Sequence, residues 1–143
     1  MTRSGIEIPP AELEVLGALW RLETGTVRQV LEDLEARGRR LAYTTVLTLL
    51  GRLEARGSVQ SRKAGQARIY RPRVSRDRVL SDRLGNLVRD LGEGRATPLI
   101  LQLFKAHKLS EGDIEKLRGI LRDLEPGATD DPGDAGGRQG RQT

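Results

Sequence analysis

The fold is decided by the stretch LAYTTVLTLLGRLEARGSVQSRKAGQARIYR, residues 41–71. Its first half predicts a helix over residues 42–56, because apolar residues recur there at the spacing of one helical face. These residues are Val46, Leu49, Leu50 and Leu53. Residues 58–62 and 67–72 then alternate between apolar and polar side chains and predict two strands, joined by a turn at 63–66. The stretch therefore predicts a helix followed by a β-hairpin.

The opposite face of this predicted helix carries Thr44, Thr45, Thr48 and Arg52. Threonine is a poor helix former because its branched Cβ restricts χ1. A helix that lies in the major groove of DNA accounts for this cost, since hydroxyls bond base edges or phosphates and threonine methyls contact thymine methyls. The helix alone is equally compatible with an ordinary surface helix, so the flanking sequence must decide.

Charge is distributed unevenly along the chain. Residues 1–36 carry 3 basic and 7 acidic side chains, residues 37–78 carry 12 and 2, and residues 79–143 carry 10 and 11. The basic side chains therefore gather on the threonine-bearing helix and the hairpin. Such a concentration is typical of a site for a polyanion, most often nucleic acid. The alternative is a solvated basic surface without a partner.

Two further helices are predicted before residue 41. Pro9 and Pro10 open a helix over residues 10–22, whose inner face consists of Leu13, Val15, Leu16, Leu19 and Trp20. Its carboxylates, including Glu12, are interpreted as solvent-facing. Thr26 and Gln29 form a capping-box pattern for a second helix, with Val27, Val30, Leu31 and Leu34 buried and Gly38 at its end. With the helix and hairpin of residues 42–72, this order predicts a winged helix-turn-helix.

Three more helices are predicted after the hairpin, over residues 75–91, 97–104 and 110–124, the last capped by Ser110 with Asp113. About 50 residues cannot bury so many large apolar side chains by themselves, because a small unit keeps too much surface. We therefore expect this segment to pack against the same segment of a second copy. The side chains expected at that interface are Leu80, Leu84, Leu87, Leu91, Leu99, Leu103, Phe104, Leu117 and Leu121.

The expected fold class is mainly α with a small β wing: an N-terminal winged helix-turn-helix followed by a three-helix C-terminal dimerisation domain. The expected boundaries are a flexible N-terminus at 1–8, the DNA-binding domain at 9–73, the dimerisation domain at 74–125 and a glycine-rich, disordered tail at 126–143.

The sequence lacks the residues that metal binding and the common kinds of catalysis require. Cysteine is absent and His107 is the only histidine, which argues against a zinc site or a thiol nucleophile. The sequence shows neither a phosphate-binding glycine loop nor a nucleophile–base pairing. It also shows no secretory leader and no apolar run long enough for membrane insertion. We therefore expect no enzymatic activity, no metal or other cofactor, and a cytoplasmic location.

The chain resembles the penicillinase repressor family, the BlaI/MecI/CopY type of bacterial transcriptional regulator, over about residues 8–124. The most specific stretch is AYTTVLTLLGRLEARG at 42–57, supported by ELEVLGALW at 12–20, TVRQV at 26–30, YRP at 70–72 and LS at 109–110. The resemblance implies a homodimeric repressor on a pseudo-palindromic operator of double-stranded DNA, upstream of β-lactamase or related stress genes.

The resemblance also implies roles for individual residues. Those matching the family's base-reading positions are Thr44, Thr45, Leu47 and Thr48. Contacts to the DNA backbone are expected from Arg39, Arg40, Tyr43, Arg52, Arg62, Lys63, Gln66 and Arg68. The last four lie on the hairpin, where arginine and lysine suit phosphates or a narrow minor groove.

Two departures from the family pattern bear on regulation. Antibiotic-responsive members are cut by a membrane-bound sensor metalloprotease between an Asn and a Phe, and the matching positions here are Gln102 and Leu103. The copper-responsive branch carries C-terminal cysteines, which this chain lacks. The resemblance thus implies release by proteolysis as one route, with the sensor metalloprotease as partner, while the departure from Asn–Phe leaves its site at 102–103 open.

Two other function classes compete with a DNA-binding repressor. A winged helix can serve as a protein-interaction module that docks an acidic partner on its basic face. The chain can also be pictured as an accessory domain of an enzyme, which the missing catalytic residues disfavour. Binding to duplex DNA at two salt concentrations separates the first alternative from the repressor.

Overall fold

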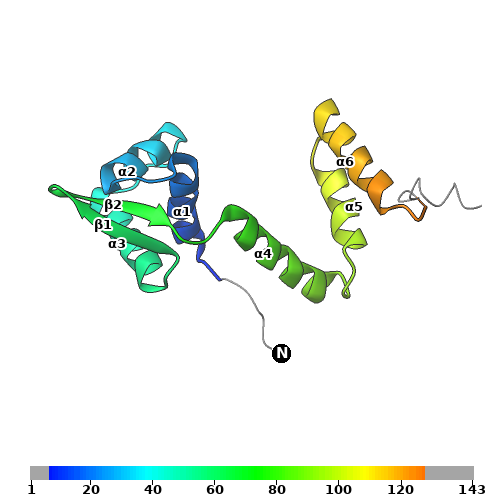
Figure 1. The fold of residues 1–143 in the computed structure, drawn as a ribbon, viewed down its shortest axis with the longest axis horizontal. Coiled ribbons are helices and arrows are strands. Elements are labelled where there is room, and N and C mark those ends of the chain that lie inside the picture. The colour runs from blue at the N-terminus through cyan, green and yellow to red at the C-terminus, as the bar shows by residue number, and fades with distance from the viewer. Residues whose placement is uncertain (1–6, 128–143) are drawn as a thin grey trace, which may run out of the picture. The chain divides into compact units, whose positions relative to one another are not determined.

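A computed structural model describes residues 7–127 of the chain, which divides into two compact units that meet between Arg95 and Ala96. The first unit contains α1 (Pro10–Leu22), α2 (Val27–Ala36), α3 (Tyr43–Ala55), β1 (Val59–Ala64), β2 (Ala67–Pro72) and α4 (Arg76–Leu91) (Figure 1). The second contains α5 (Thr97–Ala106) and α6 (Glu111–Leu124). The mainly helical fold with a small β wing that the sequence predicts is confirmed.

The core of the first unit lies between α1, α2 and α3. The stripe predicted for α3 is fully confirmed, since Val46, Leu50 and Leu53 are 0% exposed and Leu49 is 6% exposed. It packs against Val15, Leu16 and Leu19 of α1 and the four buried residues of α2. Trp20, expected in this core, is only partly buried at its edge. The apolar spacing of three helices thus accounts for one shared core.

Local signals set the ends of these helices. Thr26 Oγ1 accepts a hydrogen bond from the Gln29 backbone N–H at 3.1 Å, and Gln29 Oε1 accepts one from the Thr26 N–H at 2.9 Å, which confirms the capping box. Gly38 follows α2 with φ 84°, a left-handed conformation that suits glycine. The chain can therefore turn sharply from α2 toward α3.

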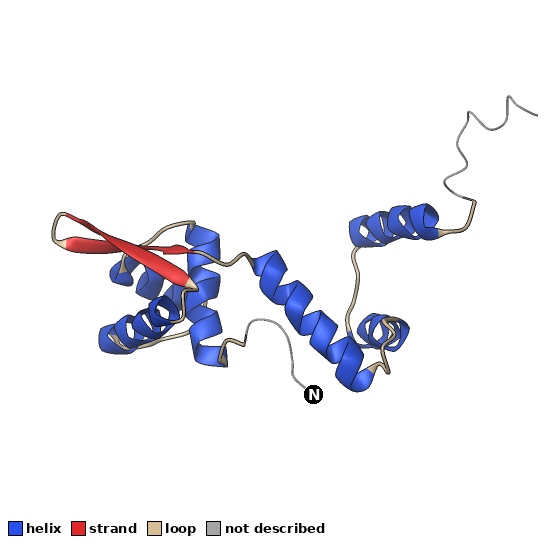
Figure 2. Ribbon diagram, turned by 60° about the horizontal axis from the view of Figure 1, so that its bottom comes forward, coloured by secondary structure: helices blue, strands red, loops and turns tan. Residues whose placement is uncertain are grey.

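The two strands form an antiparallel hairpin in which Ser61 pairs with Tyr70 and Val59 with Pro72 (Figure 2). β1 continues to Ala64, two residues beyond the predicted end, so the turn is reduced to Gly65 and Gln66. Tyr70 is only 3% exposed, and its backbone exchanges hydrogen bonds of 2.8 and 3.0 Å with Gly25. The base of the wing is therefore bound to the loop before α2.

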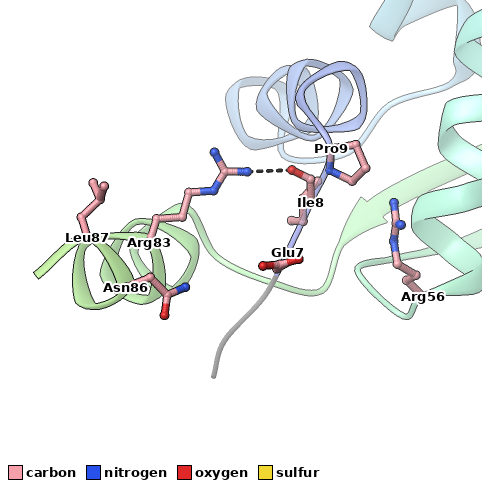
Figure 3. Close-up of a pocket in the computed structure, with 7 residues that line it drawn as sticks. All are labelled: Glu7, Ile8, Pro9, Arg56, Arg83, Asn86 and Leu87. Atoms are coloured by element: carbon pink, nitrogen blue, oxygen red, sulfur yellow. Dashed lines mark hydrogen bonds between the residues drawn. The ribbon is translucent and has the colours of Figure 1, made fainter. Parts of the chain in front are cut away.

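The segment after β2 is attached to the same core. Trp20 Nε1 donates a hydrogen bond of 2.9 Å to the Val74 carbonyl, and Arg76 lies 5.3 Å from the centre of the Trp20 ring. Arg83 of α4 donates a bond of 2.7 Å to the Ile8 carbonyl, in a pocket that Figure 3 shows between α4 and the N-terminal segment. These contacts place α4 in the unit of the winged helix, although its residues belong to the dimerisation domain expected at 74–125.

Two expectations for the N-terminal region are wrong. Ile8, expected in a flexible N-terminus, is 4% exposed and belongs to the core. Glu12, expected in solvent, is 3% exposed and forms an ion pair with Arg56, the residue that follows α3. Both side chains are covered by residues distant in sequence, which helical periodicity does not reveal. The rest of the predicted N-terminus, residues 1–6, lies outside the described residues.

The second unit differs from the first in burial. None of the residues of α5 or α6 is buried. Ser110 Oγ accepts a hydrogen bond of 3.1 Å from the Asp113 N–H, which confirms the predicted cap of α6. Most of the tail predicted at 126–143 lies outside the described residues. Within the described part of the chain, no helix has the length and apolar character needed to cross a membrane.

Candidate nucleic-acid interface

The outer face of α3 presents the side chains predicted to read bases. Thr44, Thr45, Leu47 and Thr48 are all exposed, and Leu47 is 44% exposed despite being apolar. They are held there because the buried stripe of α3 fixes the rotation of the helix about its axis. The face therefore combines hydroxyl donors and acceptors with apolar groups, which is the set that base edges and thymine methyls require.

The first turn of α3 lies next to this face and lacks a side-chain cap, since its N-cap residue is Ala42. The helices α2, α4 and α6 have caps from Thr26, Ser75 and Ser110. The first backbone N–H groups of α3 therefore have no hydroxyl acceptor of this kind. Such groups at the positive end of a helix can bond to a phosphate.

The basic side chains predicted on the wing are exposed at its tip and along its strands. The four predicted residues are all exposed to solvent: Arg62, Lys63, Gln66 and Arg68. Arg68 is also held in place by hydrogen bonds. Its Nη1 donates a hydrogen bond of 2.9 Å to Ser61 Oγ, and Ser61 Oγ donates one of 2.6 Å to Glu54 Oε2. This series of hydrogen bonds links the wing to the last turn of α3.

A groove lies between α3, the N-terminal end of α2 and the wing. Its lining is formed by Thr26, Val27, Arg28, Tyr43, Leu47, Gln66, Ala67, Arg68 and Tyr70. Burial raises the pKa of the Tyr70 hydroxyl above its ordinary value; the nearby Glu54 carboxylate adds to this increase and Arg68 opposes it. The Tyr70 phenol, which belongs to the groove lining, therefore stays neutral across the physiological pH range.

Sequence reasoning missed one basic residue of this region. Arg28, the second residue of α2, has its guanidinium carbon 5.5 Å from the centre of the Tyr43 ring. This contact brings α2 and α3 together beside the predicted base-reading residues. The only signal in the sequence was a basic residue just after the capping Thr26, which on its own indicates an exposed position and nothing more.

The remaining predicted backbone contacts fall into two groups. Arg40 and Arg52 are exposed near the two ends of α3, as a backbone contact requires. Arg39 already has a partner within the protein, because its Nε donates a hydrogen bond of 2.9 Å to Glu14 Oε2 of α1. A phosphate would have to compete with this carboxylate, so Arg39 is less available than its place in the sequence suggested.

The predicted dimerisation residues are mostly accessible. Among the described large apolar side chains that are exposed are Leu80, Leu84, Leu87 and Leu91 of α4 and Leu103, Phe104 and Leu121 of the second unit. Leu99 and Leu117 are partly buried. Gln102 and Leu103, the positions considered for cleavage, are both exposed in α5. Their roles stay predictions.

A family model described as "Penicillinase repressor" matches residues 8–123. The chain belongs to this family. The match covers the winged helix, α4, α5 and nearly all of α6. The resemblance stated from residues 42–57 and the shorter stretches around them is therefore confirmed, and the family is one of transcriptional repressors, not of enzymes.

Two curated relatives agree with this membership. The chain is 34% identical over 117 residues to "Transcriptional regulator BlaI" of Mycobacterium tuberculosis strain H37Rv, covering 81% of this chain and 83% of the relative. It is 26% identical over 121 residues to "Methicillin resistance regulatory protein MecI" of Mammaliicoccus sciuri, covering 85% and 98%. A solution structure of Bacillus licheniformis BlaI, in monomeric form with the blaP half-operator, aligns with TM-score 0.44 and 25% identity over 53% of this chain and 92% of that one.

Among the residues that the structure describes, His, Cys, Asp and Glu form no group of three or more able to hold a metal ion. What the described residues do bring together is an exposed polar helix face, a basic wing and the groove that joins them.

Proposed function

We propose that the chain is a sequence-specific DNA-binding repressor that reads its operator with α3. The single observation that carries the proposal is the division of α3 into a fully buried stripe and an outer face of three exposed threonines and Leu47. Membership of the penicillinase repressor family supports the same role. The basic wing supplies phosphate contacts, which fix the register of a protein on the duplex without selecting its sequence.

We infer that the repressor acts as a homodimer. In support, α5 and α6 have no buried residue, and Phe104 remains 47% exposed. A second copy would cover these apolar side chains. A two-fold dimer also presents two copies of α3 to the two halves of a pseudo-palindromic site, which raises affinity over a single half-site.

The proposal extends to the regulated genes and to release. Family membership favours genes for β-lactamase or a related stress response. Cleavage between Gln102 and Leu103 by a membrane sensor metalloprotease would divide α5, within the unit proposed for dimerisation. Mass spectrometry of the chain from cells treated with a β-lactam tests this route. A fragment ending at Gln102 supports it, and a chain that stays intact in cells whose target genes are expressed contradicts it.

The test of sequence reading starts with selection of duplexes from a random pool by the full chain. The triple variant Thr44→Ala, Thr45→Ala, Thr48→Ala is then compared with the natural chain on the selected duplex and on a scrambled one. Each lost base contact removes about 1–3 kcal/mol of discrimination. We expect the preference for the selected duplex to fall at least tenfold, while affinity for the scrambled duplex changes little.

The matched control is Thr97→Ala, which removes a threonine hydroxyl from α5 and leaves α3 and the wing unchanged. It should retain the full preference. Selectivity that survives the triple change would show that α3 does not read the bases. Binding to an acidic protein surface without any duplex binding would instead favour a protein-interaction module.

A further inference from the structure

We propose that Arg28 binds a phosphate of the DNA strand that lies in the groove between α3 and the wing, a groove that Arg68 also lines. The inference rests on the proposed function, because it names the part of the DNA that this groove receives. It adds Arg28 of α2 to a set of contacts that the sequence places only on residues 39–68.

The charge of the groove suits a polyanionic strand. Arg28 and Arg68 both line it, and none of the described residues in its lining is acidic. Gln66 and Thr26 supply neutral hydrogen-bonding groups beside the two arginines. Because a phosphate diester carries one negative charge per nucleotide, each of the two arginines that line the groove can bind a phosphate of a strand.

The partner of Arg28 differs from the partners of Arg21, Arg39 and Arg56. Arg21 donates to Asp33 at 3.0 Å, Arg39 donates to Glu14 at 2.9 Å, and Arg56 pairs with Glu12. Arg28 instead stacks over the Tyr43 ring, and the structure shows no described carboxylate paired with it. Stacking restrains the guanidinium and leaves its N–H groups available to an anion.

Arg68 is restrained by a hydrogen bond within the wing. Its Nη1 donates to Ser61 Oγ at 2.9 Å, so one edge of the guanidinium is fixed against β1. The arginine itself is exposed. The two arginines are therefore held by the protein before DNA arrives, one by an aromatic ring and one by a hydroxyl, which lowers the entropy lost on binding.

The groove lining also has an apolar part, which continues onto the outer face of α3. Leu47 belongs both to the groove and to the outer face of α3. Val27 and Ala67 provide further apolar surface, which suits the carbons of a deoxyribose better than a charged group. A strand that lies in the groove would therefore pass directly beside the threonines proposed to read its bases.

The experiment compares Arg28→Gln with Arg37→Gln in the full chain. Arg37 is the matched control, because it is also an arginine at an end of α2, 56% exposed at its side chain, and lies outside the groove. Binding is measured on a scrambled duplex of about 30 base pairs, long enough for two half-sites one helical turn apart, and on the selected duplex, from about 50 to about 200 mM salt.

For Arg28→Gln we expect affinity for both duplexes to fall about tenfold and the slope of log affinity against log salt to decrease by about 0.9, the value for one lost phosphate contact. Arg37→Gln should change affinity less than about twofold at the same salt. Arg28→Lys should recover part of the affinity and the full slope, because the charge is restored without the planar stacking group.

Equal affinities and equal salt slopes for Arg28→Gln and Arg37→Gln would overturn the inference and leave the proposed function standing. The same holds if Arg28→Gln lowers affinity only in proportion to a loss of folded protein, measured by thermal denaturation, with an unchanged slope. If the natural chain binds neither duplex at the lowest salt, the proposed function itself fails and this inference fails with it.

Discussion

The two units of the chain solve the burial of apolar side chains in different ways. In the first unit, three helices and the hairpin enclose a core in which Leu16, Leu50 and Leu53 are 0% exposed. In the second, helices of similar amphipathic pattern leave Phe104 47% and Leu121 57% exposed. Helical periodicity is thus present in both units, but only α1, α2, α3 and the hairpin cover one another's apolar faces. The α4 helix of the first unit still exposes Leu80, Leu84, Leu87 and Leu91.

The difference teaches that amphipathic spacing predicts which face of a helix is apolar without saying what covers it. A unit of two helices cannot enclose a core, because nearly every residue remains at its surface. Large apolar patches on such a unit indicate an interface. We therefore propose that the first unit makes the DNA contacts and that the second associates with another copy.

The largest expected effect tests whether the core of the first unit is complete. Leu50→Ala should lower the free energy of unfolding by about 2–5 kcal/mol, because it leaves a cavity among fully buried neighbours. Leu101→Ala in α5, where the leucine is 53% exposed, is the control and should leave the unfolding of the first unit unchanged. Urea denaturation followed by Trp20 fluorescence reports on the first unit alone.

A second change tests whether the exposed apolar side chains of the second unit form a dimer interface. Phe104→Glu places a charge on the proposed interface and should raise the dimer dissociation constant about 100-fold, or about 2.7 kcal/mol. Lys105→Glu, the neighbouring exposed position, is the control and should raise it far less. Sedimentation equilibrium measures both. An unchanged dimer with Phe104→Glu would show that α5 does not contribute to association.

Much of the first unit could be predicted from local sequence patterns. The stripe of α3, the buried side of α2 and the capping box of Thr26 depend on residues within one helix, so periodicity and capping rules locate them. The outer face of α3 followed from the same periodicity. The ends of the helices were accordingly close to those observed.

The parts that could not be predicted all depend on contacts between distant segments. Glu12 pairs with Arg56, the Ile8 carbonyl accepts a hydrogen bond from Arg83 of α4, and the Arg28 guanidinium lies over the Tyr43 ring. Nothing in the local pattern of any of these residues distinguishes it from a solvent-exposed neighbour. The attachment of α4 to the winged helix through Val74 was missed for the same reason.

A third prediction concerns the ion pair inside the first unit. The Glu12 side chain is 4% exposed and that of Arg56 is 43% exposed. Arg56→Ala should therefore lower stability by about 2 kcal/mol, since it leaves a buried carboxylate without its partner. Glu12→Gln should lower it less, because the freed arginine can turn to water. Equal losses in urea denaturation would contradict this asymmetry.

The smallest expected effect compares the caps of the two units. Thr26→Ala should lower the stability of the first unit by about 1 kcal/mol, because the Gln29 N–H loses its acceptor. Thr24→Ala, two residues earlier and outside the capping box, is the control and should change stability by less than about 0.5 kcal/mol. Ser110→Ala should not affect the unfolding of the first unit.

The central claim is that two copies of α3, joined through the second unit, occupy one pseudo-palindromic duplex. The mass of the complex in solution tests it most directly, by sedimentation of the full chain with its selected duplex at saturating protein. The account predicts two chains on each duplex, and weaker, stepwise binding of single chains for Phe104→Glu. A saturated complex with one chain per duplex would contradict it.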